Sequence, residues 1–318
     1  MKSKVVILLG KHETIDNQGI KLLKENYKIF YHNTYIDLLE DSEALLSEAI
    51  LVRGEYINET LINNMPNLKI IARSGVGTDN INIDIATRKS IYVCNVPDAN
   101  YISVAEHVIG MLISLSHQIV NGDKSIREGN FDARHQFIGR ELSGKTLGII
   151  GFGRIGKLVA QKSLYGLNMN ILVYDPYIHS TDNDKITLVK AKEEVFLNSD
   201  FISLHLPYNK KLHNFINKKS FKQMKNDAYI INCSRGGLIN ETELAEAIKN
   251  NEIGGAALDV FHVEPPDYNH MLWEVENLIA TPHMGASTQE AITRMVLGAS
   301  KEIDRVLKKQ KPENSLNI

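Results

Sequence analysis

The segment 146–175 constrains the fold of this chain more than any other stretch. It begins with a short apolar run, 147–150, of the kind that forms a parallel strand buried on both faces. A group of glycines, a helical pattern and a second apolar run that ends on an acid come next. The glycines are Gly151, Gly153 and Gly156, and the acid is Asp175. This order predicts a strand, a tight turn, a helix and a second strand, as in a parallel α/β sheet.

The spacing of these residues is typical of a dinucleotide-binding turn. One glycine makes the turn, one lets the backbone approach a pyrophosphate, and one lets helix and strand pack closely. The helix N-terminus presents unpaired N–H groups to phosphate oxygens. Asp175 follows Gly151 by 24 residues, where a carboxylate accepts from ribose hydroxyls and repels a 2′-phosphate. A glycine cluster alone is most often an ordinary loop, but here strand, helix and acid agree, so we predict binding of NAD.

Alternating strand-like and helical patterns extend on both sides of this turn. At 318 residues the chain is long for a single core, so we expect two domains. The βα pattern repeats through residues 1–98 and resumes after Asp175. A long, almost wholly apolar helix is predicted over 101–120, then a polar, irregular connection over 121–145, and a last amphipathic helix over 287–308. The apolar helix needs cover on most sides, which a domain interior or a subunit interface provides.

The composition argues against several classes of protein. A formal net charge of −2 gives no reason to expect nucleic acid or an anionic membrane as a partner. Cys94 and Cys233 have neither the number nor the spacing of a disulfide framework or a zinc site, so we expect a reduced, cytoplasmic protein without a metal. The apolar run at 5–9 is too short for a signal peptide, and no run reaches the ~20 residues of a membrane span.

Three polar residues stand at or just after predicted strand ends in the second half of the chain: Arg235, Glu264 and His283. Ligands of open parallel sheets bind at such ends. An arginine binds a carboxylate through two parallel hydrogen bonds, and a histidine exchanges a proton near neutral pH. A glutamate on the far ring nitrogen orients the imidazole and favours its protonated form. Each residue alone also fits a structural role, but together they predict a site for a 2-oxo acid and its 2-hydroxy acid.

Six motifs resemble, in sequence and in order, those of the D-isomer-specific 2-hydroxyacid dehydrogenases. They are RSGVGTDNIN (73–82), NVPDANYISVAEH (95–107), GKTLGIIGFGRIG (144–156), INCSRGGLIN (231–240), ALDVFHVEPP (257–266) and TPHMGAST (281–288). The resemblance implies two doubly wound parallel-sheet domains of α/β class, one flavodoxin-like and one a Rossmann NAD domain, with a cleft between them. It implies a discontinuous substrate domain, residues 1–98 plus 287–318, and an NAD domain over 99–286.

The resemblance also implies roles for matching residues. Arg235 would anchor the substrate carboxylate, with His283 as the acid/base and Glu264 as its partner. A loop whose backbone N–H groups face that carboxylate would consist of Ser74, Gly75, Val76 and Gly77. Residues implied to contact NAD are Gly151, Gly153, Arg154, Ile155 and Gly156 at the pyrophosphate, and Asp175, Pro207, Cys233, Asp259 and Ala286 along the adenosine and nicotinamide sites. Asp259 would lie near the carboxamide, and Cys233 would be a small packing residue.

Within the family, the chain is most similar to the group that oxidises 3-phosphoglycerate in serine biosynthesis, at 52–54, 73–80, 139–151 and 312–317. A phosphorylated substrate needs a cation besides Arg235. Arg53, at the end of a predicted strand, stands where that group's phosphate arginine would be, and a salt bridge is its structural alternative. Arg73 and Arg134 are further candidates.

Other functions stay open. A hydroxypyruvate or glyoxylate reductase, or thirdly a D-lactate dehydrogenase, needs no phosphate site. A protein that senses NAD(H) without turnover, like some corepressors of the family, would keep the same glycine turn. Because the chain ends after its last predicted helix, we expect a short form without the regulatory domain of longer relatives. A homodimer joined through the helix at 101–120 is the expected assembly.

Overall fold

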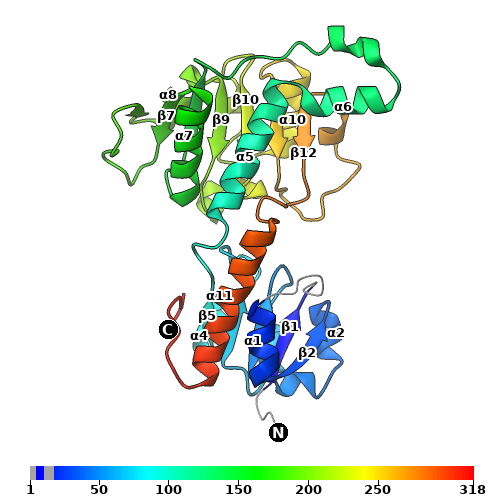
Figure 1. The fold of residues 1–318 in the computed structure, drawn as a ribbon, viewed down its shortest axis with the longest axis vertical. Helices are drawn as coiled ribbons and strands as arrows, with labels where there is room; N and C mark the ends of the chain where they lie inside the picture. The colour runs from blue at the N-terminus through cyan, green and yellow to red at the C-terminus, as the bar shows by residue number, and fades with distance from the viewer. Residues whose placement is uncertain (1–4, 11–17) are drawn as a thin grey trace. The chain divides into compact units, whose positions relative to one another are not determined.

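The computed structural model describes residues 5–10 and 18–318, and the chain divides into two compact units (Figure 1). The first unit comprises Met1–Asn100 and Ser287–Ile318, and the second comprises Tyr101–Ala286. The chain first passes from one unit to the other after Asn100, two residues later than the predicted boundary after residue 98. Each unit is a parallel sheet with helices on both faces, which confirms the predicted α/β class.

The first unit is built on a five-stranded parallel sheet in the order β2-β1-β3-β4-β5. Its strands are β1 (Val5–Leu9), β2 (Lys28–His32), β3 (Ala49–Val52), β4 (Ile70–Arg73) and β5 (Tyr92–Cys94). Strand β3 is buried along its whole length, which explains its continuous apolar sequence. The strand order reverses between β1 and β3, and ligands of such sheets bind at the carboxyl ends beside the reversal. Arg53 directly follows β3 at that edge.

Helices cover both faces of this sheet. On one face α1 (Gln18–Asn26) and α11 (Gln289–Leu307) pack together, and Thr288 caps α11 by accepting from the Ala291 N–H. The helices of the other face are α2 (Tyr35–Leu39), η1 (Ala44–Leu46), α3 (Glu59–Asn63) and α4 (Ile83–Arg88). The apolar residues Leu38, Leu39, Leu45 and Leu46 predict one helical stretch. The structure has two short elements there, because the Asp41 carboxylate accepts from the N–H groups of Glu43 and Ala44 and begins a new turn.

The second unit is built on a seven-stranded parallel sheet in the order β12-β11-β10-β9-β6-β7-β8. Its strands are β6 (Thr146–Ile150), β7 (Asn170–Tyr174), β8 (Ile186–Leu188), β9 (Phe201–Leu204), β10 (Tyr229–Asn232), β11 (Gly255–Leu258) and β12 (Leu278–Ala280). The order reverses between β6 and β9, and the glycine turn directly follows β6. The short strand β8 has no counterpart in the sequence prediction.

Two hydrophobic layers enclose this second sheet. One face packs against α5 (Tyr101–Ser116) and α7 (Arg154–Leu167), which also contact each other (Figure 1). The elements on the other side are α8 (Lys192–Asn198), η3 (Lys210–Leu212), α9 (Lys218–Phe221), η4 (Gly236–Leu238), α10 (Glu241–Lys249) and η5 (Met271–Glu274). Burial of α5 in this layer accounts for its apolar sequence.

The segment after α5 differs from the prediction. The helix ends at Ser116, because Gln118 takes a left-handed φ of 56° and interrupts it. A second helix, α6 (Ile119–Arg127), and a 3-10 segment, η2 (Phe131–His135), then occupy what was expected to be an irregular connection. In Figure 1, α6 runs outward from the sheet, and we call residues 117–139 the arm.

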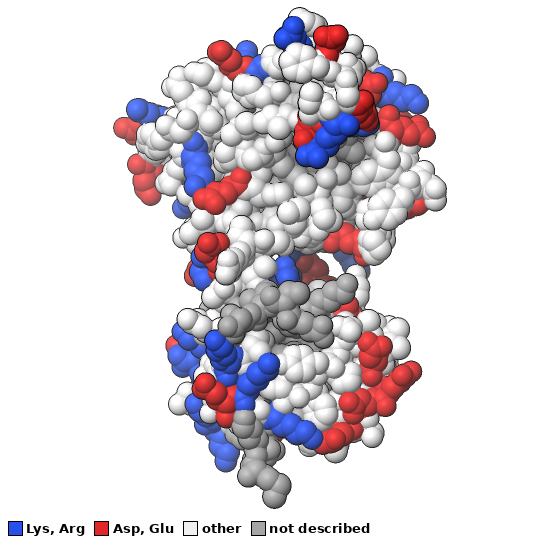
Figure 2. Space-filling model, turned by 45° about the vertical axis from the view of Figure 1, so that its right-hand side comes forward, with Lys and Arg blue, Asp and Glu red and all other residues white. Residues whose placement is uncertain are grey.

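Two surface properties bear on possible partners. None of the helices in the described part of the chain combines the length and hydropathy needed to cross a membrane. Figure 2 shows a mostly uncharged face with scattered groups of Lys and Arg and of Asp and Glu side chains. The sequence as a whole is close to charge balance, with 36 basic and 38 acidic residues.

Candidate functional site

The register of the seven-stranded sheet brings candidate residues to one edge. All its strands are parallel and their last paired residues are in register, so the next residues form a row. Across the sheet from β7 to β12 this row is Asp175, Gly151, His205, Cys233, Asp259 and Thr281. Four of the six are predicted site residues. His205 and Thr281 lacked an assigned role, because their contacts depend on neighbouring strands.

The three glycines of the turn meet different constraints. Gly151 has a φ of +93°, and a Cβ there would lie 2.5 Å from the carbonyl oxygen of His205. A Cβ on Gly156 would lie 2.2 Å from the carbonyl oxygen of Gly151, so the helix packs closely against the turn. A Cβ on Gly153 would meet open space. The backbone at Gly153 is therefore the part of the turn that a ligand can approach.

Asp175 is bonded to the turn itself. One carboxylate oxygen accepts from the Phe152 N–H at 2.8 Å, and the other accepts from the Tyr177 N–H at 2.9 Å. Each oxygen retains capacity for a further hydrogen bond, so ribose hydroxyls can still bind. Helix α7 begins at Arg154, and its N-cap Gly153 has no side chain that could occupy the first-turn N–H groups. These features fit a dinucleotide with its pyrophosphate at the helix N-terminus.

Arg235 is held in a tight turn after β10. The buried Asn232 side chain donates to the Arg235 carbonyl at 2.9 Å and accepts from the N–H and hydroxyl of Ser234. The Arg235 guanidinium donates to the Ser234 carbonyl at 2.7 Å. A Cβ on Gly236 would lie 1.9 Å from the Phe261 backbone, so this turn touches the segment that leads to Glu264. Asn232 is a supporting residue that only the turn geometry reveals.

Glu264 and His283 form a direct pair. The Nδ1 atom of His283 lies 2.7 Å from one Glu264 carboxylate oxygen, and the other oxygen accepts from the Phe261 N–H at 3.1 Å. Burial raises the pKa of Glu264, but the hydrogen bond and charge of His283, the Phe261 N–H and the charge of Arg235 outweigh it and hold the pKa below its usual value. His283 and Arg235 thus both lie within electrostatic range of Glu264 in the second unit.

Asp259, which is predicted to lie near the carboxamide, is hydrogen-bonded within the protein. Its buried carboxylate accepts from the hydroxyl of Thr281 at 2.6 Å and from the N–H groups of Met284 and Gly285, both at 2.8 Å. Burial raises the pKa of Asp259. The hydrogen bonds from His107, Thr281 and the two N–H groups outweigh this effect and hold the pKa below its usual value. The carboxylate is thus occupied in holding the backbone next to His283, and the predicted contact with a carboxamide remains a proposal.

A pocket of about 360 Å³ adjoins the Glu264–His283 pair. Its other lining residues are Phe261, Pro265, Pro266, Tyr268, Trp273, Ala280, Thr281 and Pro282. The lining is mainly apolar, and the His283 side chain at its edge is 47% exposed. Three predicted cofactor residues lie at the same sheet edge: Pro207 after β9, Cys233 after β10 and Ala286 at the end of the loop after β12. Burial and the Asp259 charge raise the pKa of the Cys233 thiol well above its usual value, which fits a packing role.

In the first unit, Arg53 and the loop at 74–77 follow neighbouring strands whose ends, Val52 and Arg73, are paired. The Arg53 guanidinium donates to the Ser287 hydroxyl at 3.3 Å, and burial lowers its pKa. The Arg73 guanidinium folds back over the loop and donates to the Ser74 carbonyl at 2.7 Å. A Cβ on Gly75 would collide with it, at 1.3 Å from a guanidinium nitrogen.

The backbone hydrogen bonds of the loop at 74–77 show which of its N–H groups can bind a ligand. The Ser74 N–H donates to the Val52 carbonyl at 2.8 Å, and the Gly75 N–H donates to the Arg73 carbonyl at 2.9 Å. These two N–H groups are therefore not free to bind a carboxylate, in contrast to the prediction. Among the described residues, the N–H groups of Val76 and Gly77 have no hydrogen-bond acceptor. They are the donors that the loop offers to a ligand.

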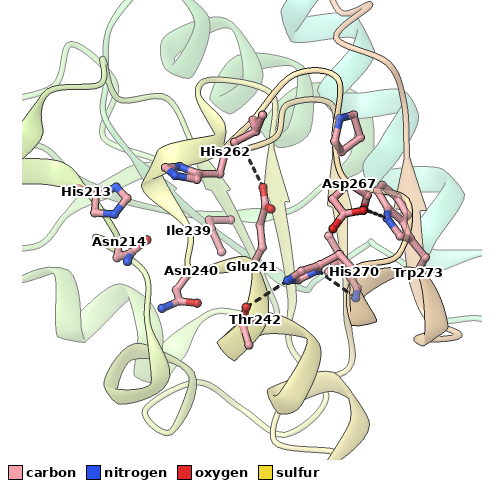
Figure 3. Close-up of a pocket in the computed structure, with 13 residues that line it drawn as sticks. His213, Asn214, Ile239, Asn240, Glu241, Thr242, His262, Asp267, His270 and Trp273 are labelled. Carbon is pink, nitrogen blue, oxygen red and sulfur yellow. Dashed lines mark hydrogen bonds between the residues drawn. The ribbon is translucent and has the colours of Figure 1, made fainter.

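A second pocket, of about 300 Å³, is lined in part by residues that flank Glu264 in the sequence, among them Val263 and Pro266. Figure 3 shows three imidazoles around it, those of His213, His262 and His270, with the Glu241 and Thr242 side chains at the start of α10. The His270 ring pairs with the Thr242 hydroxyl at 3.1 Å, and Glu241 accepts from the His262 N–H at 2.6 Å. No group of three or more His, Cys, Asp or Glu side chains in the described structure is arranged to hold a metal ion.

The chain is similar to known proteins in sequence and in structure. Residues 109–285 match the model of the D-isomer specific 2-hydroxyacid dehydrogenase, NAD binding domain. The chain is 39% identical to the D-3-phosphoglycerate dehydrogenase of Methanocaldococcus jannaschii over 99% of its own length and 59% of that protein. It is 35% identical to the glyoxylate reductase of Pyrococcus furiosus, over 92% of this chain and 88% of that one. The solved D-lactate dehydrogenase of Aquifex aeolicus, complexed with NAD and lactic acid, superposes with a TM-score of 0.86 at 29% identity and covers 98% of this chain and 99% of that one.

The comparisons bear on both the family and the cofactor. The chain spans between 51% and 59% of the length of four curated relatives named D-3-phosphoglycerate dehydrogenase. The match to an NAD binding domain covers the glycine turn, Asp175 and His283, and confirms NAD as the predicted cofactor. With more than half of its residues in that match, the chain belongs to the D-isomer specific 2-hydroxyacid dehydrogenase family.

Proposed function

We propose that this protein is an NAD-dependent dehydrogenase that interconverts a D-2-hydroxy acid and its 2-oxo acid, with 3-phosphoglycerate and 3-phosphohydroxypyruvate as the physiological pair in serine biosynthesis. The observation that carries the reaction class is the 2.7 Å contact between Glu264 and His283, next to Arg235 and on the same sheet edge as the glycine turn. Family membership supports the class, and the curated relatives named D-3-phosphoglycerate dehydrogenase support the substrate.

Each residue has one task in the proposed reaction. Arg235 binds the substrate carboxylate through its planar guanidinium. Bound NAD(H) supplies the hydride acceptor or donor at the substrate C2. During reduction His283 donates the proton from Nε2 to the carbonyl oxygen, because its Nδ1 faces Glu264, and during oxidation it takes that proton back. Glu264 fixes the ring orientation and stabilises the imidazolium.

The preference for a phosphorylated substrate rests on Arg53. This guanidinium follows β3 at the strand-order reversal, beside the loop whose Val76 and Gly77 N–H groups are free among the described residues. Its one described side-chain partner is a neutral hydroxyl, so its charge is not neutralised by a carboxylate there. A dianionic phosphate would supply that charge. Arg134, by contrast, lies in the exposed η2 segment against the Phe131 ring and His135, which favours a surface role.

The test measures NADH oxidation with 3-phosphohydroxypyruvate, hydroxypyruvate, glyoxylate and pyruvate. We expect the highest kcat/KM for the phosphorylated acid. Arg53→Ala should raise its KM by about 10- to 100-fold, the usual value of a charge-assisted pair, and should change the KM for glyoxylate by less than about threefold. Arg88→Ala, on the exposed end of α4, is the matched control. Equal loss for both acids would remove Arg53 from phosphate binding.

A reductase for glyoxylate or hydroxypyruvate is the second candidate. The lengths of the relatives favour it. The chain covers 88% of the glyoxylate reductase of Pyrococcus furiosus but 59% of the D-3-phosphoglycerate dehydrogenase of Methanocaldococcus jannaschii. Faster turnover of the unphosphorylated acids, with no effect of Arg53→Ala, would select it. Tight binding of NADH without turnover of any of the four acids would instead point to a sensor of the cofactor.

A cytoplasmic homodimer is the proposed form of the protein. The arm exposes a series of large apolar side chains, including Ile126, Phe131 and Ile138, of which Ile138 is 85% exposed. A second copy of this chain would cover them, since a monomer rarely leaves such a group in water. Sedimentation velocity of the protein and of Ile138→Asp tests this: we expect a dimer and a shift toward monomer.

A further inference from the structure

Helix α5 carries two polar side chains one turn apart, Ser103 and His107. The Ser103 hydroxyl, in a residue only 4% exposed, donates to the Gly285 carbonyl at 2.7 Å. The Nε2 atom of His107 lies 3.1 Å from the Thr281 hydroxyl oxygen. Both side chains therefore contact residues 281–285, which we call the His283 loop.

The direction of each hydrogen bond can be assigned. The Thr281 hydroxyl donates its single proton to Asp259, at 2.6 Å. Its oxygen must therefore accept from His107, which places a proton on Nε2 of that ring. The same Nε2 lies 3.4 Å from the Asp259 carboxylate. His107 thus acts as a donor to both partners and anchors the carboxylate that holds the loop.

The His283 loop needs such an anchor because its backbone is in an unfavourable conformation. His283 has a φ of +50°, in the left-handed region that non-glycine residues rarely adopt. Three successive N–H groups are tied to Asp259: that of His283 to the backbone carbonyl, and those of Met284 and Gly285 to the side chain, each at 2.8 Å. A change in the position of Asp259 therefore moves the residue that carries the imidazole.

Close packing joins the helix to the loop. A Cβ added to Gly285 would lie 3.0 Å from the Asp259 carboxylate and 3.5 Å from the His107 ring. Tyr101 is the first residue of the second unit and Ala286 the last, so both passages of the chain out of this unit are tied together by the Ser103–Gly285 bond. The start of α5 and the end of the His283 loop thus form one structural block.

We infer that Ser103 and His107 are positioning residues for the acid/base: they set the place and orientation of the His283 imidazole through the His283 loop, with Asp259 and Thr281 as intermediates. This inference rests on the proposed function for its consequence in catalysis. The side-chain contacts found for both residues are with the loop and its anchor. A loss of either should therefore affect the chemical step and spare binding of the cofactor and the 2-oxo acid.

The experiment compares His107→Leu, His107→Gln and Ser103→Ala with the unaltered protein. His107→Leu removes the donor, whereas His107→Gln keeps an N–H at a similar reach. We expect His107→Leu to lower kcat by about 10- to 100-fold, the usual effect of a small misplacement of a reacting group, with the KM of the 2-oxo acid within about threefold. NADH affinity should stay within about twofold, and His107→Gln should recover most of the rate.

A second readout does not depend on turnover. Amide hydrogen exchange at residues 283–285 should accelerate in His107→Leu and in Ser103→Ala, because these N–H groups depend on the anchored Asp259. His117→Leu is the matched control, since that ring is exposed and has no hydrogen-bond partner in the described part of the chain.

Each contrary result has a distinct meaning. Normal kcat in both His107→Leu and Ser103→Ala, a slower rate without faster exchange, or failure of His107→Gln to recover the rate would overturn the inference. If His107→Leu does not fold, Ser103→Ala decides by the same two measurements. An unaltered protein that turns over no 2-oxo acid would refute the proposed function instead, while the exchange data would still test the anchoring of the loop.

Discussion

The Nδ1 atom of His283 lies 2.7 Å from a carboxylate oxygen of Glu264. The second oxygen of that carboxylate is fixed by the Phe261 N–H, so the glutamate cannot rotate freely away from the ring. Nε2 is consequently the ring nitrogen that can exchange a proton with a ligand. The backbone of His283 is held separately by Asp259, so the ring is constrained from two directions.

Glu264→Gln should lower kcat and change how the stability of the protein depends on pH. The neutral amide of this variant lacks the charge that pairs with the imidazole, so it should hold the ring less firmly in its catalytic orientation. Because the pKa of Glu264 is lowered in the folded protein, its stabilising effect is present above the unfolded pKa of about 4.3 and is lost as pH falls through the folded value. Urea unfolding should therefore show a larger difference between the two proteins at pH 6 than at about pH 3. The same difference at both pH values would contradict the pairing.

Arg235→Ala should separate substrate binding from cofactor binding. Loss of the planar guanidinium should raise the KM of the 2-oxo acid by about 100-fold, while NADH affinity, measured by fluorescence titration, should change by less than about twofold. Arg235→Lys keeps the charge but lacks the two parallel donors, so only part of the loss should be recovered. A comparable fall in NADH affinity would show that the turn itself had collapsed.

Asp175→Ala should weaken the discrimination between NADH and NADPH. The carboxylate repels a 2′-phosphate, and it also holds the glycine turn through the Phe152 N–H. The ratio of kcat/KM for the two cofactors should fall by about 10- to 100-fold, partly through weaker binding of NADH. Asp182→Ala, an exposed acid in the loop after β7, is the control. An unchanged ratio would remove Asp175 from cofactor selection.

The parts of this fold that could be predicted from sequence are those in which local pattern and burial agree. The strand and helix on either side of Gly151 combine apolar runs with a glycine spacing that has few alternative uses. The sequence pattern predicts a helix over 241–249, and α10 has those bounds, because the Asn240 side chain caps its first turn. Consistency between levels of structure makes such segments predictable.

The parts that sequence could not give depend on distant contacts. Helix α6 lies in a polar stretch whose few apolar residues are exposed, so burial leaves no pattern in the sequence. The Ser74 N–H bonds to Val52 of the neighbouring strand and the Gly75 N–H to Arg73 of its own turn. Among the described residues, these bonds leave the N–H groups of Val76 and Gly77 as the donors of the loop. The Asp259 carboxylate likewise bonds to Thr281 at the end of the neighbouring strand, and the Asn232 side chain bonds within the turn that carries Arg235.

The central claim is that His283 supplies the proton for reduction of a 2-oxo acid by NADH in this site. The most direct measurement is the rate of NADH oxidation with 3-phosphohydroxypyruvate by the unaltered protein and by His283→Ala, at saturating concentrations of both ligands. We expect turnover by the unaltered protein and a kcat lower by about 10²- to 10⁴-fold in the variant, with NADH affinity preserved. A near-normal kcat in His283→Ala would contradict the account.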